Sequence, residues 1–239
     1  MNVVQSLWIG ESLGRMEVAC IKSFLRLGYE YHLYTYDDLA NIPEGTTILD
    51  GNEILSKERI FKYQGPKRLG GGSYSGFSNY FRFNLLRIKG GIWVDADVYC
   101  LKRLPKVEDY LLVRHDDRNI TAGIIQCPVN CEFANYCCEV CDSKDPNVII
   151  WGETGPRLVK KAVKELGLGE LVRPHEMFFP IHWVNLRRFL ENTPLGDAYT
   201  IHFWNEEWRR RKVDKNAVYD KNCLYEKLLN FRMNKIKFM

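Results

Sequence analysis

The 239-residue chain has no long apolar run, and this absence limits what the protein can be. A helix that crosses a bilayer needs about 20 consecutive apolar residues, and no segment approaches that length. The first residues, MNVVQSLWIG, also lack the cationic start and the apolar stretch of a secretory signal. We therefore expect no membrane-spanning segment and no secretion, and the starting Met1 favours a cytoplasmic protein over an excised domain.

Internal repeats, low-complexity linkers and a strong overall charge are missing as well. Hydrophobic residues make up 46% of the chain and charged residues 27%, which is typical of a globular protein. A chain of this length can bury a substantial core in one domain, so residues 1–239 are expected to form a single domain. With a net charge of only +4, we expect no nucleic-acid partner.

The modest charge is unevenly distributed, because residues 208–239 carry ten Lys or Arg and three Asp or Glu. In this basic tail, Leu224, Tyr225, Leu228 and Leu229 recur at helical spacing. A basic amphipathic helix can lie on an anionic membrane surface, which would make the protein a peripheral one. The alternative is that these apolar residues pack on the domain and the cations face solvent.

Five of the eight cysteines are clustered, and their spacing has two interpretations. Cys127-x3-Cys131 and Cys138-x2-Cys141 superficially resemble a zinc site, although the intervening loop is short for one. The same stretch reads as a helix that ends at Asp142 and has Asn130 as its cap. Reduced, partly buried thiols are the favoured interpretation, and without a secretory signal we expect no disulfides.

The first fifty residues have the pattern of a strand, a helix and further strands. Apolar β-rich runs at 3–9, 31–36 and 46–49 predict strands, and a helix is expected from a cap at Ser12 through Leu27. A β-α-β opening implies a parallel strand pair with a right-handed crossover. The chain therefore belongs to the α/β class.

Residues 75–105, SGFSNYFRFNLLRIKGGIWVDADVYCLKRLP, are the most informative stretch of the chain. An amphipathic helix is expected to end at Gly90-Gly91, and the apolar run 92–94 predicts a buried strand. Asp95 and Asp97 then follow at the strand end, where α/β sheets bind ligands. Because such carboxylates repel, they favour a shared hard cation, Mn²⁺ or Mg²⁺, and through it a diphosphate. A surface turn is the alternative, but the strand and helix leading into the acids favour a site.

The residues around this pair resemble a known superfamily. Ser78-Asn79, Arg82, Gly90-Gly91, Asp95-Ala96-Asp97, Leu101 and Leu104 occur in its order and at its spacing. It is the superfamily of DxD-motif glycosyltransferases that contains family 32, the α-1,4-galactosyltransferase-like enzymes and the glucosylating clostridial toxins. The resemblance covers residues 3–210 and implies a GT-A-like, three-layer α/β/α fold with a mixed, mostly parallel central sheet.

The resemblance also implies roles for particular residues. The metal ligands would be Asp95, Asp97 and His202, unless His202 is structural. The donor would contact Trp8, Ile9, Gly10, Ser78, Asn79, Arg82, Asp95, Trp204, Asn205 and Trp208, with the Trp8 ring stacked on the base unless it belongs to the core. Where the family has aspartate to hold a donor-sugar hydroxyl, this chain has Asn79, so the sugar stays open. Glu153 lies in a TGP-like motif on the acceptor side and is a further catalytic candidate, or a first-turn acid that favours the helix dipole.

The resemblance implies metal-dependent, retaining transfer of a hexose from a UDP-sugar to a hydroxyl of a glycan or lipid-linked glycan, as in polysaccharide biosynthesis. One alternative, a sugar nucleotidyltransferase, would show a glycine-rich loop and a lysine after the first strand, where this chain has Trp8-Ile9-Gly10-Glu11. A non-catalytic glycan-binding module would keep Trp204 and Trp208 but would not need Arg82 together with the aspartates.

Overall fold

A computed structural model describes residues 2–231, and its centre is a seven-stranded sheet with the strand order β3-β2-β1-β4-β7-β6-β8. β1 pairs in parallel with β2 and β4, β2 with β3, and β6 with β8, whereas β7 runs antiparallel to both β4 and β6. The strands are β1 (Val3–Leu7), β2 (Glu30–Thr35), β3 (Thr46–Asp50), β4 (Gly91–Val94), β6 (Leu111–Arg114), β7 (Ile120–Cys127) and β8 (Val172–Arg173). A small second sheet pairs β5 (Val98–Cys100) with β9 (Thr200–His202).

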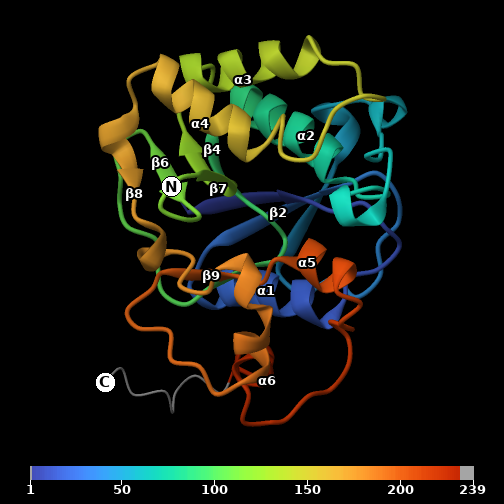
Figure 1. The fold of residues 1–239 in the computed structure, drawn as a ribbon, viewed down its shortest axis with the longest axis vertical. Helices are drawn as coiled ribbons and strands as arrows, with labels where there is room; N and C mark the ends of the chain where they lie inside the picture. Colours follow the sequence, from blue (N-terminus) through green and yellow to red (C-terminus); the bar gives the residue numbers. More distant parts are fainter. Residues whose placement is uncertain (1, 232–239) are drawn as a thin grey trace.

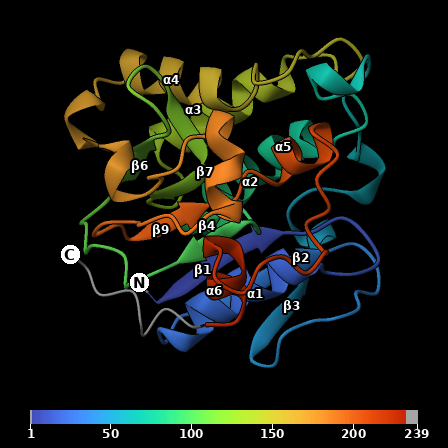
Figure 2. The same cartoon turned by 60° about the horizontal axis from the view of Figure 1, so that its bottom comes forward.

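Helices cover both faces of the large sheet (Figures 1 and 2). On one side lie α2 (Ser75–Lys89), α3 (Glu132–Asp142) and α4 (Pro156–Glu165), and on the other lie α1 (Arg15–Arg26) and α6 (Leu224–Leu229). The short helix α5 (Asn205–Arg210) follows β9. The predicted three-layer α/β/α architecture with a mixed, mostly parallel sheet is confirmed.

The helix starts differ from the prediction because backbone geometry, and not the nearest hydroxyl or amide, decides each cap. α1 begins at Arg15, and the Glu17 carboxylate accepts a hydrogen bond of 3.0 Å from the Gly14 N–H. Ser12 instead forms an isolated bridge with Ala40. Cys131 caps α3, because Asn130 has a left-handed φ of 52° that places it outside the helix. Gly155 caps α4, and the side chain of the preceding Thr154 is buried.

The basic tail is part of the folded domain as far as the structure describes it. Leu224, Tyr225 and Leu228 are fully buried in one apolar cluster with Met16 and Phe203. The apolar face predicted for a membrane surface is therefore occupied by the protein itself, and the alternative interpretation is correct for these residues. The cationic residues 232, 235 and 237 of the prediction lie outside the described residues.

Three arginines of the tail before α6 are also paired with acids. Arg209 and Arg210 pair with Glu206 at 2.5 and 3.3 Å, and Arg211 lies 3.5 Å from Glu207.

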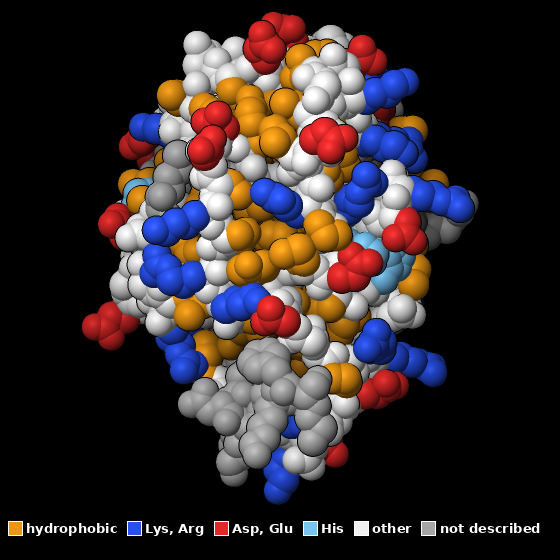
Figure 3. All heavy atoms as spheres, turned by 90° about the vertical axis from the view of Figure 1, so that its left-hand side faces the viewer, with side chains coloured by type: hydrophobic (Ala, Val, Ile, Leu, Met, Phe, Trp, Pro, Cys, Tyr) orange, Lys and Arg blue, Asp and Glu red, His pale blue; other side chains and the backbone are white. Residues whose placement is uncertain are grey.

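On the face beside β6 and β8, basic and acidic side chains alternate around apolar ones, so neither sign dominates there (Figure 3). None of the helices in residues 2–231 has the length and apolar character that crossing a membrane requires.

All eight cysteines are free thiols, as expected. Cys127, Cys137, Cys138 and Cys141 are buried, and only Cys131 of the cluster is partly exposed. Within residues 2–231, the groupings of side chains that could hold a metal contain no cysteine. The favoured interpretation as reduced, mostly buried thiols therefore fits better than a zinc site.

Candidate active site

A cleft of about 620 Å³ opens at the sheet edge where β1 and β4 end. The chain leaves β4 at Val94 and turns through Asp95-Ala96-Asp97 before β5 begins. Of the residues predicted from the sequence, those that line the cleft are Trp8, Ile9, Ser78, Asn79, Arg82, Asp95, Asp97, His202, Trp204 and Asn205. A volume of this size is in the usual range for a small-molecule site.

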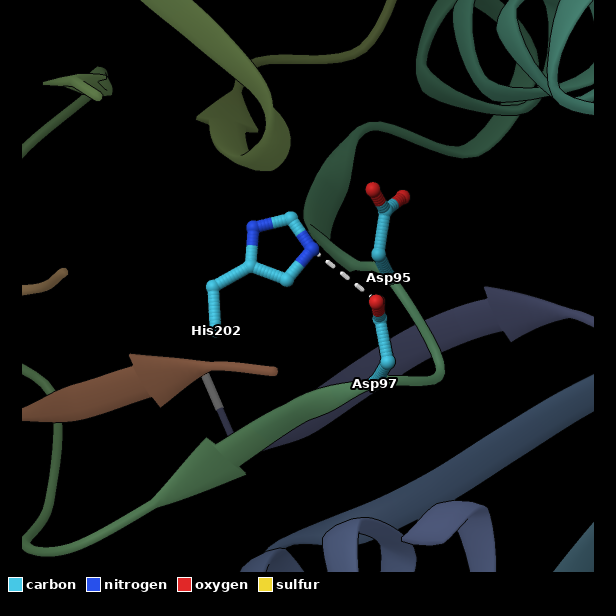
Figure 4. Close-up of side chains that lie close together, drawn as sticks. All are labelled: Asp95, Asp97 and His202. Atoms are coloured by element: carbon cyan, nitrogen blue, oxygen red, sulfur yellow. Dashed lines mark hydrogen bonds and ion pairs between the residues drawn. The ribbon is translucent and has the colours of Figure 1, made fainter. Parts of the chain in front are cut away.

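Asp97 and His202 come from distant parts of the chain, and the small sheet brings them together. β5 pairs antiparallel with β9, and in that register Val98 lies opposite His202. The His202 Nε2 atom lies 3.1 Å from Oδ1 of Asp97 (Figure 4). The Asn205 N–H donates a hydrogen bond of 2.7 Å to the other oxygen of Asp97. Asp97 is thus held by β9 and by the first residue of α5.

The pKa of each member of this pair is shifted in the direction that favours its charged form, although both side chains are buried. Burial disfavours the Asp97 carboxylate, but the His202 ring and the Asn205 N–H outweigh it and lower the pKa of Asp97. Burial also disfavours the protonated ring, yet Asp97 and then Asp95 raise the pKa of His202. A cation is therefore favoured between these side chains, either as the ring proton or as a bound metal.

Asp95 is anchored through one oxygen only. Its Oδ1 accepts hydrogen bonds from the Arg82 guanidinium at 2.6 Å and from the Trp93 indole at 2.8 Å. Its Oδ2 faces the Gly123 backbone, where an added Cβ would lie 3.1 Å from that oxygen and 3.3 Å from His202 Nδ1. Glycine at position 123 therefore leaves open the space between Asp95 and His202.

Asp95, Asp97 and His202 fit a divalent metal by their chemistry and placement. One ligand atom from each can be chosen so that all lie within 4.8 Å of one another (Figure 4). His202 Nδ1 is buried and has no hydrogen-bond partner among the described residues. Two carboxylates and an imidazole are suitable ligands for Mn²⁺, and the carboxylates also suit Mg²⁺.

Arg82 is committed to its neighbours within the protein. Its side chain is 4% exposed, contacts the Asn79 amide oxygen, and has its guanidinium 4.8 Å from the centre of the Trp93 ring. Asn79 in turn lies 3.5 Å from the Thr154 hydroxyl. The predicted contact of Arg82 with the donor stays a prediction, whereas its role in holding Asp95 is evident from the geometry.

Trp8 follows β1 and is partly exposed in the cleft, as stacking on a base would require. Its indole N–H donates to the Ser12 carbonyl at 3.2 Å. The Lys215 ammonium lies 5.1 Å from the ring centre and pairs at 2.6 Å with the buried Glu17 carboxylate. The C-terminal segment thus supports the Trp8 ring, which the sequence did not indicate.

Three predicted site residues do not line the cleft. Trp208 is 1% exposed, donates to the Phe203 carbonyl and packs against Tyr225, so its assignment to donor binding was wrong and its role is packing. Glu153 turns toward Lys144, 2.7 Å away, which fits the alternative of a structural acid. Gly10 forms the turn beside the Trp8 indole.

Sequence reasoning missed several residues that shape the site, namely Trp93, Thr121, Gly123, His115, Lys215 and Trp183. Trp93 stands two residues before Asp95, and the alternation of side chains along β4 could have placed both on the same side of the strand. No local signal pointed to Gly123 or Lys215, because each reaches the site only through strand pairing or the path of the tail.

Comparison with known proteins finds similarity to glycosyltransferases, the class that the sequence resembles. Residues 133–231 match the family described as alpha 1,4-glycosyltransferase conserved region, and residues 66–124 match capsular polysaccharide synthesis protein. The lactosylceramide 4-alpha-galactosyltransferases of Rattus norvegicus and Mus musculus are each 27% identical over 149 residues, or 54% of this chain and 41% of theirs. The chain therefore spans less than half the length of these relatives. The solved PaToxG glycosyltransferase shares the fold at 11% identity, with a TM-score of 0.52 over 99% of this chain and 86% of that one.

The α/β/α fold and the acid-bearing cleft at its sheet edge define the class: the fold is GT-A-like, and a solved glycosyltransferase shares it. Within that class, the sequence matches make the chain similar to the family 32-like glycosyltransferases, among them the alpha 1,4-glycosyltransferase region and the lactosylceramide 4-alpha-galactosyltransferases.

Proposed function

We propose that the protein transfers a hexose from a UDP-sugar to a glycan hydroxyl in a metal-dependent reaction that retains the anomeric configuration. The observation that carries the proposal is the group Asp95, Asp97 and His202, which shares one cleft with the aromatic ring of Trp8. A metal-binding group next to a ring that can stack on a base is what a nucleoside diphosphate requires.

Different residues of the cleft would bind the metal, the base and the sugar. Asp95, Asp97 and His202 would hold the Mn²⁺ or Mg²⁺ ion, which when bound neutralises charge on the leaving diphosphate. Trp8 would bind the base, while Ser78 and Asn79 of α2 would contact the sugar. Arg82 fixes Asp95 through one oxygen and leaves the other for the ligand. No carboxylate in the cleft is assigned as a nucleophile, and the leaving phosphate itself can accept the acceptor's proton.

The relatives indicate the class of donor and acceptor. Two of them are named as galactosyltransferases that act on lactosylceramide, so UDP-galactose is the first donor to test. The match to a capsular polysaccharide synthesis family supports a polysaccharide or a lipid-linked glycan as acceptor. A cytoplasmic location belongs to the same proposal.

The competing functions have less support. A sugar nucleotidyltransferase would place a cationic phosphate-binding loop after β1, where this structure has Trp8 and the Gly10 turn. A glycan-binding module would not need Asp97 and His202 held 3.1 Å apart beside Asp95 in the cleft.

The test is to incubate the protein with UDP-galactose, UDP-glucose and UDP-N-acetylglucosamine in Mn²⁺ and to measure UDP release with and without lactose. We expect release that a chelator abolishes and that added Mn²⁺ restores. The proposal is overturned if the protein neither binds UDP nor releases it from any of these donors. The anomeric configuration of the product, read by NMR, tests retention separately.

A further inference from the structure

The cleft crosses four neighbouring strands, and the proposed donor uses only part of it. In the sheet order, β1, β4, β7 and β6 are adjacent, and β6 runs in the same direction as β1 and β4. Trp8, Asp95 and His115 therefore follow the carboxyl ends of three strands at one edge. At about 4.8 Å between strands, β6 lies roughly 14 Å from β1. With the base on Trp8 and the metal at β4, the region beyond β7 is left for a second substrate.

An exposed tryptophan stands in this region. Trp183 lines the cleft with 37% of its surface exposed, the largest exposed fraction among the tryptophans of the chain. The other rings on this side are engaged: Trp204 stacks on His202 with ring centres 3.9 Å apart, and Trp151 is covered by Arg210 at 4.1 Å. An accessible apolar ring rimmed by polar groups is typical of a ligand-binding groove.

Polar groups beside Trp183 are held in fixed positions. Asp116 Oδ2 lies 3.1 Å from His115 Nε2 and 3.7 Å from His182 Nε2, while the other Asp116 oxygen accepts from the N–H groups of Arg118 and Asn119. The His182 and Trp183 rings are 5.2 Å apart. Burial lowers the pKa of His115 to about 4, so its ring is neutral: Nε2 donates to Asp116, and Nδ1 is left to accept a hydrogen bond.

The exposed Trp183 ring and the uncharged His115 ring together favour an uncharged ligand that carries hydroxyl groups. The charge of Asp116 is already satisfied by the turn, and the adjacent ring of His115 is uncharged near neutral pH. Uncharged hydroxyl groups can bond with neutral imidazoles, and the apolar face of a sugar ring can cover an indole. An anionic group would instead require free cations, and Arg209 and Arg210 in the cleft are paired with Glu206.

We propose that Trp183 and His115 form the acceptor subsite, which takes a neutral sugar with its ring on the Trp183 indole and a hydroxyl bonded to His115. The proposal rests on the proposed function, because it assumes that the Trp8 side of the cleft holds the donor. It assigns Asp116 a positioning role through His115.

The experiment compares Trp183→Ala, Trp183→Phe and His115→Leu with the wild type, using UDP-galactose, Mn²⁺ and a panel of lactose, cellobiose, maltose, sialyllactose and a phosphorylated disaccharide. We expect Trp183→Ala to raise the acceptor KM by about tenfold, as for loss of one aromatic contact. Trp183→Phe should recover most of this loss. UDP affinity and acceptor-independent UDP release should not change in either variant.

Val184→Ala is the matched control, because Val184 is a neighbour with 46% exposure that does not line the cleft. If the wild type releases UDP but transfers only to the charged glycans, or to none of the panel, the inference is wrong. It is also wrong if Trp183→Ala leaves the acceptor KM unchanged, or raises it no more than Val184→Ala does. Absence of UDP binding and release in the wild type would instead refute the proposed function.

Discussion

The guanidinium of Arg82 lies 2.6 Å from the Asp95 carboxylate, and both groups sit at the base of the cleft. The Arg82 side chain is almost completely buried, whereas a quarter of the Asp95 side chain is exposed. The two oxygens of Asp95 therefore have different surroundings. Arg82 neutralises the inner oxygen, Oδ1, whereas the outer oxygen, Oδ2, faces the open space beside Gly123.

Replacing Arg82 by methionine should destabilise the fold. The change leaves the inner oxygen of Asp95 without its cation, and breaking a buried pair by removing one partner costs about 3–5 kcal/mol. We expect a lower urea midpoint than in Arg87→Met, since Arg87 is only partly buried and contacts Asn84. Equal midpoints for the two variants would contradict a special role for the Arg82–Asp95 pair.

Asp97→Asn should remove transfer while the fold persists. Asparagine can still accept from the Asn205 N–H, but it loses the charge that a metal and the His202 ring require. Turnover should fall by more than about a hundredfold, since losing a charged ligand costs several kcal/mol in the transition state. Mn²⁺ affinity, measured by titration calorimetry, should fall in parallel.

Asp117→Asn is the control for this change. Asp117 belongs to an exposed group with His175 and Glu176 that also meets the distance criterion for a metal, but it does not line the cleft. Its substitution should leave both turnover and Mn²⁺ affinity unchanged. A variant Asp97→Asn that keeps more than about a tenth of wild-type turnover would remove the metal assignment from Asp97.

Trp8→Ala should weaken UDP binding, because a stacked base contributes about 1–3 kcal/mol. Lys215→Met keeps the ring and removes only the cation beside it, so its effect on the UDP dissociation constant should be smaller. Circular dichroism and fluorescence-detected titration with UDP check both variants. An unchanged dissociation constant in folded Trp8→Ala protein would mean that Trp8 serves the core and not the base.

The sequence predicted the layers of the fold well because their signals are local. The apolar run at 92–94, the Gly90-Gly91 break and the β-α-β opening each act within a few residues, and β4, α1 and α2 lie where these patterns place them. The group Asp95, Asp97 and His202 was predicted only with the help of a family resemblance. Nothing local indicates that residue 202 would meet residue 97, which requires the pairing of β5 with β9.

The assignment of Trp208 to donor binding and the membrane-facing alternative for the tail fail for the same physical reason. Trp208 and Leu224 look like ligand-binding or membrane-binding residues in sequence, since both stand among cations. In the structure both are buried in the same cluster, because the tail folds back against α1 and places its apolar side chains inside. A sequence pattern gives the amphipathic face, but the surface that covers it depends on tertiary packing.

Cys131 should be the most reactive thiol of the chain near neutral pH. It is partly exposed at the start of α3, and the hydrogen bond from Cys127 and the N–H groups of the first turn lower its pKa to about 6. The rate of its alkylation by iodoacetamide should rise as the pH passes through about 6, whereas the rate for an ordinary thiol rises at about pH 8–9. Peptide mass spectrometry identifies the site, and Cys127→Ala should move the midpoint upward.

The attachment of the tail should make stability depend on acid pH. Burial disfavours the Glu226 carboxylate, but the hydrogen bond from Arg15 and the N–H of Tyr219 outweigh it and lower the pKa of Glu226. The Arg15 and Glu226 side chains meet at 2.8 Å and join α6 to the first turn of α1. The contribution of the pair is therefore fully present above the ordinary glutamate pKa of about 4.3, and it is lost as the pH falls through the lowered value.

Glu226→Gln tests this directly, because it keeps the shape and removes the charge. At pH 7 the variant should be less stable by about 1–3 kcal/mol, the usual contribution of a hydrogen bond to a charged group. As the pH falls below about 4, the difference between the variant and the wild type should shrink, since the wild-type carboxyl also becomes neutral. Urea titrations across this range measure both effects, and Glu170→Gln, at an exposed glutamate, is the matched control. A stability difference that stays constant between pH 7 and the acid limit would show that packing, and not the charge of Glu226, attaches the tail to α1.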